Sequence, residues 1–304
     1  MPARRVGPYL VAEHLAFGSM SELPWRSGPM VRTSGRVLVK LLLPHLAADA
    51  AHVEMFEHEA ELGLALRHPN VVRTLGKGHE HGTHYLVLEY VPGTTVEALG
   101  SAGSSLPIDA TLAIGIGALH ALHAAHELAD DAGPLGVVHR DVCPKNLLVS
   151  RAGAVKLFDF GLATSRRLGP REPGATRGTL AYLAPEALRG GAVDRRADVF
   201  AMGIVLHELV SGRRLFARAT EAATLLAIAD AEIPRLGALV PDVPAVLESA
   251  VARALARNPD ERFESAADFA KALGELDAAL PERLAELVAD RAAAPARRLG
   301  LESD

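Results

Sequence analysis

The stretch "GVVHRDVCPKNLLVS" (136–150) is apolar at both ends and polar in the middle, and it gathers residue types that often carry chemistry. It contains Cys143, the only cysteine of the chain, between Asp141 and Asn146. The thiol could be a nucleophile, the polar side chains could hold a metal ion, or the cysteine could be incidental to a loop in which other residues act. The elements and motifs around the stretch have to separate these three alternatives.

The first ninety residues predict a β-rich region with one helix. The helix opens at Asp49, a residue type suited to an N-cap, and stops before Pro69. Short apolar or alternating runs between Gly, Pro and Ser turns are typical of strands. These runs are "PYLVAEHLAF" (8–17), "RVLVKLLL" (36–43), "NVVRTLG" (70–76) and "THYLVLEYV" (83–91).

From about residue 107 the pattern becomes helical, and the last stretch, 281–304, is Ala/Arg-rich and predicted to be half helix and half loose tail. The predicted helices are "IDATLAIGIGALHALHAAHELAD" (108–130), "RADVFAMGIVLHELVSG" (196–212), "ATEAATLLAIADAEI" (219–233), "VPAVLESAVARALARNP" (243–259) and "SAADFAKALGELDAAL" (265–280). The sequence therefore predicts an α+β protein, with a small β lobe joined to a larger α lobe.

The composition narrows the cellular context. A formal net charge of −5 argues against nucleic acid or an anionic membrane as the main partner. A single cysteine cannot form an internal disulfide, which fits a reducing cytoplasm. The N-terminal residues 1–15 lack the apolar core of a secretory signal, and the longest uncharged run, 110–126, is shorter than the ~18 apolar residues that a spanning helix needs. We therefore expect a cytoplasmic protein without a membrane anchor.

Five short motifs follow one another in a fixed order. They are the lysine of "RVLVK" (Lys40), the glutamate of "EMFEHEAELGLALRHPNVV" (Glu59), H-R-D-x-x-x-x-N at 139–146, D-F-G at 159–161 and A-P-E at 184–186. The set resembles the signature of protein kinases, and the chain is most similar to the bacterial eukaryotic-like Ser/Thr protein kinases. The resemblance implies a bilobal kinase domain over 9–280, with an N-lobe and hinge at 9–91, a C-lobe at 92–280 and a tail at 281–304.

The resemblance implies a role for each polar residue. Lys40 would hold the α- and β-phosphates of ATP, and Glu59 would pair with Lys40 and orient it. Asp141 would accept the proton of the substrate hydroxyl or orient that hydroxyl for in-line attack. Asn146 and Asp159 would hold two Mg²⁺ ions, because hard oxygen ligands suit a hard ion.

Further positions match the family in the same way. Leu88 matches the gatekeeper, and the backbone of the hinge, Glu89–Tyr90–Val91, would hydrogen-bond adenine. Glu186 and Arg262 match a buried ion pair of the large lobe. Asp198 resembles the helix aspartate that braces the catalytic-loop backbone.

The glycine-rich loop departs from the family pattern. The three glycine positions of G-x-G-x-x-G read Ala16, Gly18 and Ser21 here, although glycine lets backbone N–H groups approach phosphates without a Cβ clash. Pro24 removes a backbone donor near the start of the second strand, and Leu38 replaces a small alanine beside the adenine site. These changes favour an alternative, a pseudokinase scaffold with weak nucleotide binding. The complete polar set favours an active kinase, because phosphoryl transfer depends mainly on positioning and Mg²⁺ electrostatics.

The segment between D-F-G and A-P-E bears on the substrate. The pattern G-T-x-x-Y-x-A-P-E (178–186) favours protein substrates over a small-molecule phosphotransferase, and Thr179 matches the threonine that accompanies Ser/Thr specificity. Thr176, before Thr164 and Ser165, is the first candidate for autophosphorylation. A phosphate there would add ~−1.5 to −2 charge near several arginines. These arginines are Arg140, Arg166, Arg167, Arg171 and Arg177. Because no fused sensor domain is recognised, we expect a separate regulatory or sensor protein as a partner.

Two histidine clusters and the cysteine complete the analysis. The clusters, His79/His81/His84 and His120/His123/His126, lack carboxylate or cysteine partners at a zinc spacing and are interpreted as ordinary turn or packing residues. Cys143 stands where Ser/Thr kinases usually carry a lysine that neutralises the γ-phosphate. Lys145 lies at the offset where tyrosine kinases place an arginine, so we expect Lys145 to supply that charge. A second hypothesis is that nearby cations lower the thiol pKa and make Cys143 sensitive to oxidation.

Overall fold

The computed structural model describes residues 5–6, 8–17, 21–26, 37–100, 104–166, 180–274, 276 and 281–298, and for 5–6, 10–17, 21–26 and 291–298 it describes the backbone alone. The chain forms two compact units. The first comprises Met1–Val91 with Asp159–Leu162, and the second comprises Pro92–Phe158 with Ala163–Asp304.

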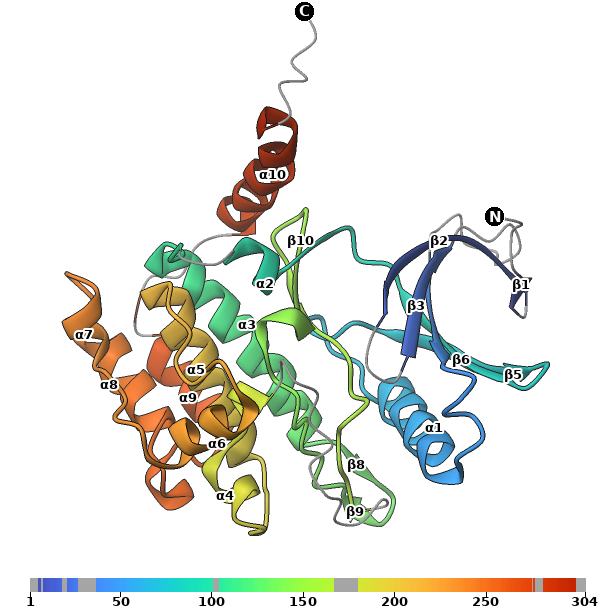
Figure 1. Cartoon of the computed structure of the whole chain (residues 1–304), viewed down its shortest axis with the longest axis horizontal. Helices are drawn as coiled ribbons and strands as arrows, with labels where there is room; N and C mark the ends of the chain where they lie inside the picture. Colours follow the sequence, from blue (N-terminus) through green and yellow to red (C-terminus); the bar gives the residue numbers. More distant parts are fainter. Residues whose placement is uncertain are drawn as a thin grey trace, which may run out of the picture. The chain divides into compact units, whose positions relative to one another are not determined.

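The first unit is an antiparallel sheet with one long helix, α1 (Ala50–Ala65), beside it (Figure 1). Asp49 caps α1 by accepting the N–H of Ala51, as predicted. Phe56 and Ala60 of α1 pack with sheet residues in one apolar cluster. The strand order is β1 (Arg5–Val6), β2 (Tyr9–Phe17), β3 (Ser21–Arg26), β4 (Val37–Leu42), β6 (Thr83–Glu89) and β5 (Thr74–Glu80).

Two details of this sheet differ from the prediction. The strand expected over 70–76 begins at Thr74 and continues to Glu80, because the apolar pair Val71–Val72 is buried ahead of the strand instead of within it. Pro24 lies inside β3, opposite His14 and beside a register shift. The missing N–H of proline is tolerated at such irregular positions of a ladder.

The second unit is mainly helical, and its helices α3 (Ile108–His126) and α5 (Arg196–Ser211) contact each other as well as α9 (Ala266–Leu273). By length and composition α3 is apolar enough to cross a membrane, but 61% of that window is buried inside the protein, as in the core helix of a folded domain. The other helices are α2 (Val96–Leu99), α4 (Pro185–Leu188), α6 (Glu221–Asp230), α7 (Leu236–Leu239), α8 (Ala245–Ala254), α10 (Pro281–Arg298) and the 3₁₀ turns η1 (Pro144–Asn146), η2 (Leu180–Tyr182) and η3 (Pro259–Glu261).

The helical unit also contains short strands next to its loops. The strand β10 (Leu147–Ser150) pairs with β11 (Val155–Leu157) and with β7 (Gly93–Thr95), and a hairpin is formed by β8 (Ala129–Asp130) and β9 (Gly133–Pro134). The polar stretch 139–146 directly precedes β10. A β-rich unit with one main helix and a larger helical unit confirm the predicted α+β fold. The helix α10 is longer than half of the Ala/Arg-rich tail, because that stretch is rich in strong helix formers.

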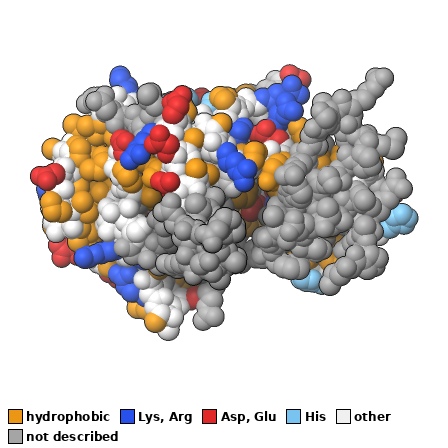
Figure 2. Space-filling model, turned by 90° about the horizontal axis from the view of Figure 1, so that it is seen from above, with side chains coloured by type: hydrophobic (Ala, Val, Ile, Leu, Met, Phe, Trp, Pro, Cys, Tyr) orange, Lys and Arg blue, Asp and Glu red, His pale blue; other side chains and the backbone are white. Residues whose placement is uncertain are grey.

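The described surface carries both signs of charge. On the face shown in Figure 2, Lys and Arg side chains lie interspersed with Asp and Glu side chains over its described part. This distribution matches the small net charge of the sequence.

Candidate active site

In the β-rich unit, the ammonium group of Lys40 lies between two carboxylates. Lys40 is in β4, and its Nζ donates to both oxygens of Glu59 in α1, at 2.6 and 2.8 Å. It also donates to Oδ1 of Asp159 at 2.7 Å. Lys40 and Glu59 are buried. Three residues from three separate motifs therefore form one connected cluster of charges.

The electrostatics of this cluster keep the lysine protonated. Burial alone would lower the pKa of Lys40, but the charges of Asp159 and Glu59 outweigh burial and raise it. Buried ion pairs are tolerated when both partners are also hydrogen-bonded, as they are here. Lys40 is therefore a fixed positive charge held in place by two acceptors.

The backbone around Asp159 is adapted to this contact. Asp159 has a left-handed conformation with φ 68°, which non-glycine residues rarely adopt and which is often found at functional sites. A Cβ atom at Gly161 would lie 3.1 Å from Asp159 Oδ1, 3.2 Å from Glu59 Oε2 and 3.4 Å from Lys40 Nζ. Glycine in D-F-G thus allows the backbone to approach the charge cluster closely.

The residues expected to contact adenine lie on the same sheet. Leu38 of β4 pairs with Leu88 of β6, so these two side chains share one face of the sheet. The N–H of Glu89, at the end of β6, donates to the carbonyl of Arg73 at 2.9 Å, and Val91 follows after the strand. In the loop region, Ala16 pairs with Leu23 and Ser21 pairs with Leu42. Gly18 lies outside the described residues.

In the helical unit, Asp141 and Asn146 contact each other directly. The Asn146 amide donates to the backbone carbonyl of Asp141 and to its Oδ2, at 2.8 Å in both cases. Asn146 ends the 3₁₀ turn η1 and is almost fully buried. Since both amide hydrogens face Asp141, the amide oxygen is the part of Asn146 left to bind a cation.

Asp198 of α5 holds the loop before Asp141. Its carboxylate accepts the backbone N–H groups of His139 at 2.8 Å and Arg140 at 2.9 Å, which confirms the predicted brace. Arg140 has a left-handed backbone with φ 63°, so the brace stabilises a conformation that a non-glycine residue would otherwise avoid.

His126, at the end of α3, is a third partner of Asp198. The His126 Nε2 lies 2.8 Å from Asp198 Oδ2, and both side chains are buried. Burial alone would raise the pKa of Asp198, but the hydrogen bond and electrostatic interaction with His126, together with those of His139, lower it. The interpretation of the cluster His120/His123/His126 as ordinary packing misses this contact, because spacing alone does not show which of its histidines faces Asp198.

Lys145 and Cys143 lie on either side of the Asp141 carboxylate. Lys145 Nζ is 3.7 Å from Asp141 Oδ2, and Cys143 Sγ is 4.0 Å from Asp141 Oδ1. Burial, followed by the charge of Asp141, raises the pKa of the Cys143 thiol. The hypothesis of a low-pKa, oxidation-sensitive cysteine is therefore wrong: the thiol is buried, and the effect of Lys145 is too small to offset burial.

The predicted ion pair Glu186–Arg262 is present in the helical unit. Two guanidinium nitrogens of Arg262 donate to the two carboxylate oxygens of Glu186, at 2.8 and 2.7 Å. Arg262 also donates to the backbone carbonyls of Ala256, Arg196 and Arg257. The pair ties the A-P-E segment to the loop before α9 with bidentate geometry.

The candidate phosphorylation sites differ in their surroundings. Thr164 forms a β-bridge with Val138, and the two residues exchange backbone hydrogen bonds of 3.0 Å. Ser165 is buried, so its hydroxyl is poorly accessible in this conformation. Thr176 and Thr179 lie outside the described residues, as do Arg167, Arg171 and Arg177.

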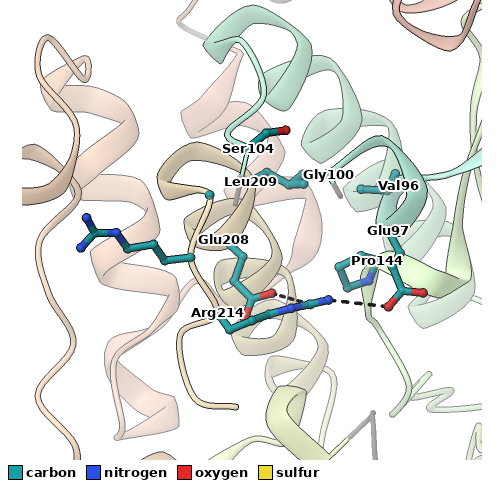
Figure 3. A pocket seen from close by; sticks show the side chains of 10 residues that line it. Val96, Glu97, Gly100, Ser104, Pro144, Glu208, Leu209 and Arg214 are labelled. Carbon is teal, nitrogen blue, oxygen red and sulfur yellow. Dashed lines mark hydrogen bonds and ion pairs between the residues drawn. The ribbon is translucent and has the colours of Figure 1, made fainter. Parts of the chain in front are cut away.

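A cavity of about 210 Å³ lies beside the turn η1. Arg214 lies between Glu208, at 3.0 Å, and Glu97, at 3.7 Å, on the wall of this cavity (Figure 3). Tyr182 donates its hydroxyl to Glu208 at 2.7 Å and also contacts Arg214. Tyr182 belongs to the pattern G-T-x-x-Y-x-A-P-E and Glu208 lies in the predicted helix 196–212, whereas Glu97 and Arg214 belong to no motif, because charge alone does not distinguish them from other surface residues.

The other histidine cluster, His79/His81/His84, spans the hairpin between β5 and β6. His79 of β5 and His84 of β6 are stacked across the hairpin, with ring centroids 4.1 Å apart, whereas His81 is at the turn with φ 48°. The interpretation as a turn is therefore right for His81 only. Among the described residues, no group of three or more His, Cys, Asp or Glu side chains could hold a metal ion.

Comparison with known proteins identifies the family that the chain resembles. Residues 27–277 match the family model described as the protein kinase domain. The chain is similar to the tyrosine-protein kinase MasK of Myxococcus xanthus, with 39% identity over 276 residues, 88% of this chain and 42% of that protein. It is also similar to the serine/threonine-protein kinase PknB of Mycobacterium leprae, with 31% identity over 93% of this chain and 45% of that protein. The chain thus spans less than half of the length of these two relatives.

A shorter relative and a solved structure give the same result. The serine/threonine-protein kinase PknL of Mycobacterium tuberculosis is 34% identical over 90% of this chain and 67% of its own length. The crystal structure of the PknI kinase domain of Mycobacterium tuberculosis has a TM-score of 0.68 and 28% identity, covering 90% of this chain and 98% of that chain. The family match begins at residue 27, so the degraded glycine-rich loop, residues 16–21, lies before the matched region.

Proposed function

Because this chain belongs to the protein kinase family, among the eukaryotic-like kinases of bacteria, we propose that it transfers the γ-phosphoryl group of ATP to Ser or Thr hydroxyls of protein substrates. The observation that carries the proposal is the position of Lys40 between Glu59 and Asp159. Phosphoryl transfer relies on fixed charges that position and stabilise the transferred group, and this cluster supplies them.

Lys40 is the proposed ligand of the ATP α- and β-phosphates, and Glu59 is its positioning partner. Leu38, Leu88, Glu89 and Val91 are proposed to contact the adenine ring or its polar edge. The loop residues Ala16, Gly18 and Ser21 are proposed to cover the phosphates through their backbone N–H groups.

Asp141 is the proposed acceptor for the hydroxyl proton of the substrate, and its geometry supports that role. The carboxylate is oriented by the Asn146 amide at 2.8 Å and lies 3.7 Å from Lys145 Nζ. A positive charge beside the proton acceptor would neutralise charge on the γ-phosphate. Lys145 is therefore proposed to replace the cation that Cys143 cannot provide.

Asn146 and Asp159 fit the donor set for Mg²⁺, since each presents an oxygen atom and hard oxygen ligands suit this ion. Mg²⁺, when bound, supplies charge neutralisation at the phosphates. The residues of this chain then have to orient the hydroxyl, hold the lysine and accept the proton.

A pseudokinase scaffold with weak nucleotide binding is the rival proposal, and the loop 16–21 is the feature that favours it. A thermal-shift assay with ATP, with and without Mg²⁺, separates the two. A Mg²⁺-dependent shift supports the kinase. No shift at millimolar ATP, together with no phosphotransfer, supports the scaffold.

Tyrosine specificity is a second candidate, and two observations favour it. A relative with 39% identity is named a tyrosine-protein kinase, and the cation beside Asp141 is four residues after it, at Lys145. Phosphoamino acid analysis of a phosphorylated protein substrate decides between Ser/Thr and Tyr as acceptors.

The remaining proposals concern the context of the reaction. We propose a kinase domain over 9–280 with a tail at 281–304, a cytoplasmic location, and a separate regulatory or sensor protein as a partner. Autophosphorylation is proposed at Thr176 first, before Thr164 and Ser165. Mass spectrometry after incubation with ATP tests it, and an active enzyme with unmodified Thr176 would contradict this choice.

The central test is incorporation of labelled phosphate from ATP and Mg²⁺ into a generic protein substrate such as dephosphorylated casein. Wild type is expected to incorporate label, and Asp141→Asn is expected to lose nearly all of it. Equal signals from the two proteins would overturn the proposal.

A further inference from the structure

The helix α1 is attached to the sheet along one row of paired residues. Leu86 of β6 pairs with Lys40 of β4 on one side and with Lys77 of β5 on the other. Directly paired residues of neighbouring strands project from the same face of a sheet. Lys40, Leu86 and Lys77 therefore form a line across three strands, with an apolar residue between two lysines.

The helix presents a matching row to this line. Phe56 and Ala60 pack against Leu86 in one apolar cluster. Glu59 binds Lys40 at 2.6 Å, and Glu57 binds Lys77, also at 2.6 Å. Each lysine of the sheet therefore pairs with a glutamate on its own side of the apolar contact.

Helix geometry explains this symmetry. At about 100° per residue, Phe56 and Ala60 are only ~40° apart and define the midline of the packed face. Glu57 and Glu59 then lie ~80° to either side of that midline. Rotation of α1 about its axis in either direction moves one glutamate away from its lysine, so the two pairs together define the rotation of the helix.

Glu57 has a second hydrogen-bond donor besides Lys77. Nδ1 of His84 in β6 lies 3.0 Å from Glu57 Oε1, while Lys77 binds the other oxygen, Oε2. Burial would raise the pKa of Glu57, but the hydrogen bonds from Lys77 and His84 outweigh it and lower the pKa. The side chains of Lys77 and Glu57 are each 35% exposed and that of His84 is 17% exposed, so this clasp of Glu57, Lys77 and His84 is accessible to solvent and salt.

We propose that Glu57, clasped by Lys77 and His84, is a positioning residue that sets the rotation of α1 and thereby keeps Glu59 on Lys40. This inference rests on the proposed kinase function for its effect on catalysis. Its structural part, the hold on α1, is independent of that function.

The first experiment compares Glu57→Gln with Glu54→Gln, an equal change of charge at an exposed position of the same helix. We expect Glu57→Gln to lower kcat by about twofold to fivefold, the range of a partly exposed ion pair. The KM for ATP is expected to stay within about twofold, because the proposed adenine contacts lie on β4, on β6 or directly after β6, and not on α1. Glu54→Gln is expected to match wild type, and an equal fall of kcat in the two variants would overturn the proposal.

Amide hydrogen exchange tests the proposal without catalysis. In Glu57→Gln, the amides of α1 are expected to exchange faster than in Glu54→Gln, with other helices unchanged. If wild type transferred no phosphate, the proposed function would be wrong, but hydrogen exchange would still show whether Glu57 holds α1 in place. Unchanged exchange in α1 together with unchanged kcat, or a uniform increase across the whole chain, would overturn the clasp.

Discussion

In the β-rich unit a cation lies between two carboxylates, whereas in the helical unit a carboxylate lies between backbone N–H groups and an imidazole. Lys40 joins Glu59 and Asp159 through side chains only. Asp198 instead binds the main chain at His139 and Arg140. The first arrangement fixes the position of a charge, and the second fixes the conformation of a loop.

The difference has an energetic consequence. When Lys40 is lost, Glu59 can take up a proton, since burial and the nearby Asp159 already raise its pKa. When the Asp198 carboxylate is lost, two backbone N–H groups and a buried imidazole lose an ionised acceptor, and no proton can replace those bonds. We therefore expect activity to depend on both sites and stability to depend mainly on Asp198.

The largest expected effect is that of Asp198→Asn on stability. The amide keeps one acceptor oxygen but presents an NH₂ group toward donors, so the free energy of unfolding should fall by about 3–5 kcal/mol. Denaturant unfolding of the two proteins measures it. A loss below about 1 kcal/mol would mean that the loop conformation does not depend on this carboxylate.

Lys40→Met should lower phosphotransfer strongly and the free energy of unfolding only slightly, in contrast to the large stability loss expected for Asp198→Asn. We expect phosphotransfer to fall by about 10²- to 10³-fold, the effect of removing one preorganised charge-stabilising group. The free energy of unfolding is expected to change by no more than about 2 kcal/mol, because Glu59 can be protonated. Steady-state kinetics and denaturant unfolding on the same sample provide the comparison. A stability loss as large as that of Asp198→Asn would remove the distinction between the two units.

Much of this arrangement could be predicted from the sequence, because the motifs occur in a known order. Lys40, Glu59, Asp141 and Asn146 each belong to a motif whose spacing is maintained, and the secondary structure around them follows from apolar periodicity. The N-cap at Asp49 could also be predicted, because capping depends on the residue type at the start of the helix.

Contacts between residues outside the motifs could not be predicted. The bond from His126 to Asp198 joins positions 72 residues apart, and the pair Lys77–Glu57 depends on a strand register that the sequence does not reveal. The burial of Cys143 was missed because exposure depends on how the surrounding elements pack. The nearby cations favour a lower thiol pKa, but the loss of solvation on burial has the larger effect and raises it.

A smaller effect is expected for Lys145→Ala. The Lys145 side chain is 40% exposed and its Nζ lies 3.7 Å from Asp141 Oδ2, so solvent screening limits its contribution. We expect kcat to fall about tenfold, which corresponds to ~1.4 kcal/mol of barrier, with stability unchanged. Lys145→Arg, which keeps the charge, is the matched control and should recover most of the activity. If Lys145→Ala transferred phosphate as fast as wild type, the cation would have no part in the reaction.

The smallest expected effect belongs to Cys143, the neighbour of Asp141 on its other side. Because burial raises the thiol pKa, the thiolate stays unpopulated in the folded protein as the pH rises from 7 to 9, whereas an exposed thiol ionises over this range. Iodoacetamide should therefore label Cys143 slowly at both pH values in the native protein and rapidly after denaturation. Cys143→Ala should change kcat by less than about twofold, since a buried neutral thiol 4.0 Å from Asp141 Oδ1 offers no charge to the γ-phosphate. Fast, pH-dependent labelling of the native protein would contradict the raised thiol pKa. A loss of kcat as large as that of Lys145→Ala would show that Cys143 acts in the reaction, and that Cys143 and Lys145 differ less in function than their charges indicate.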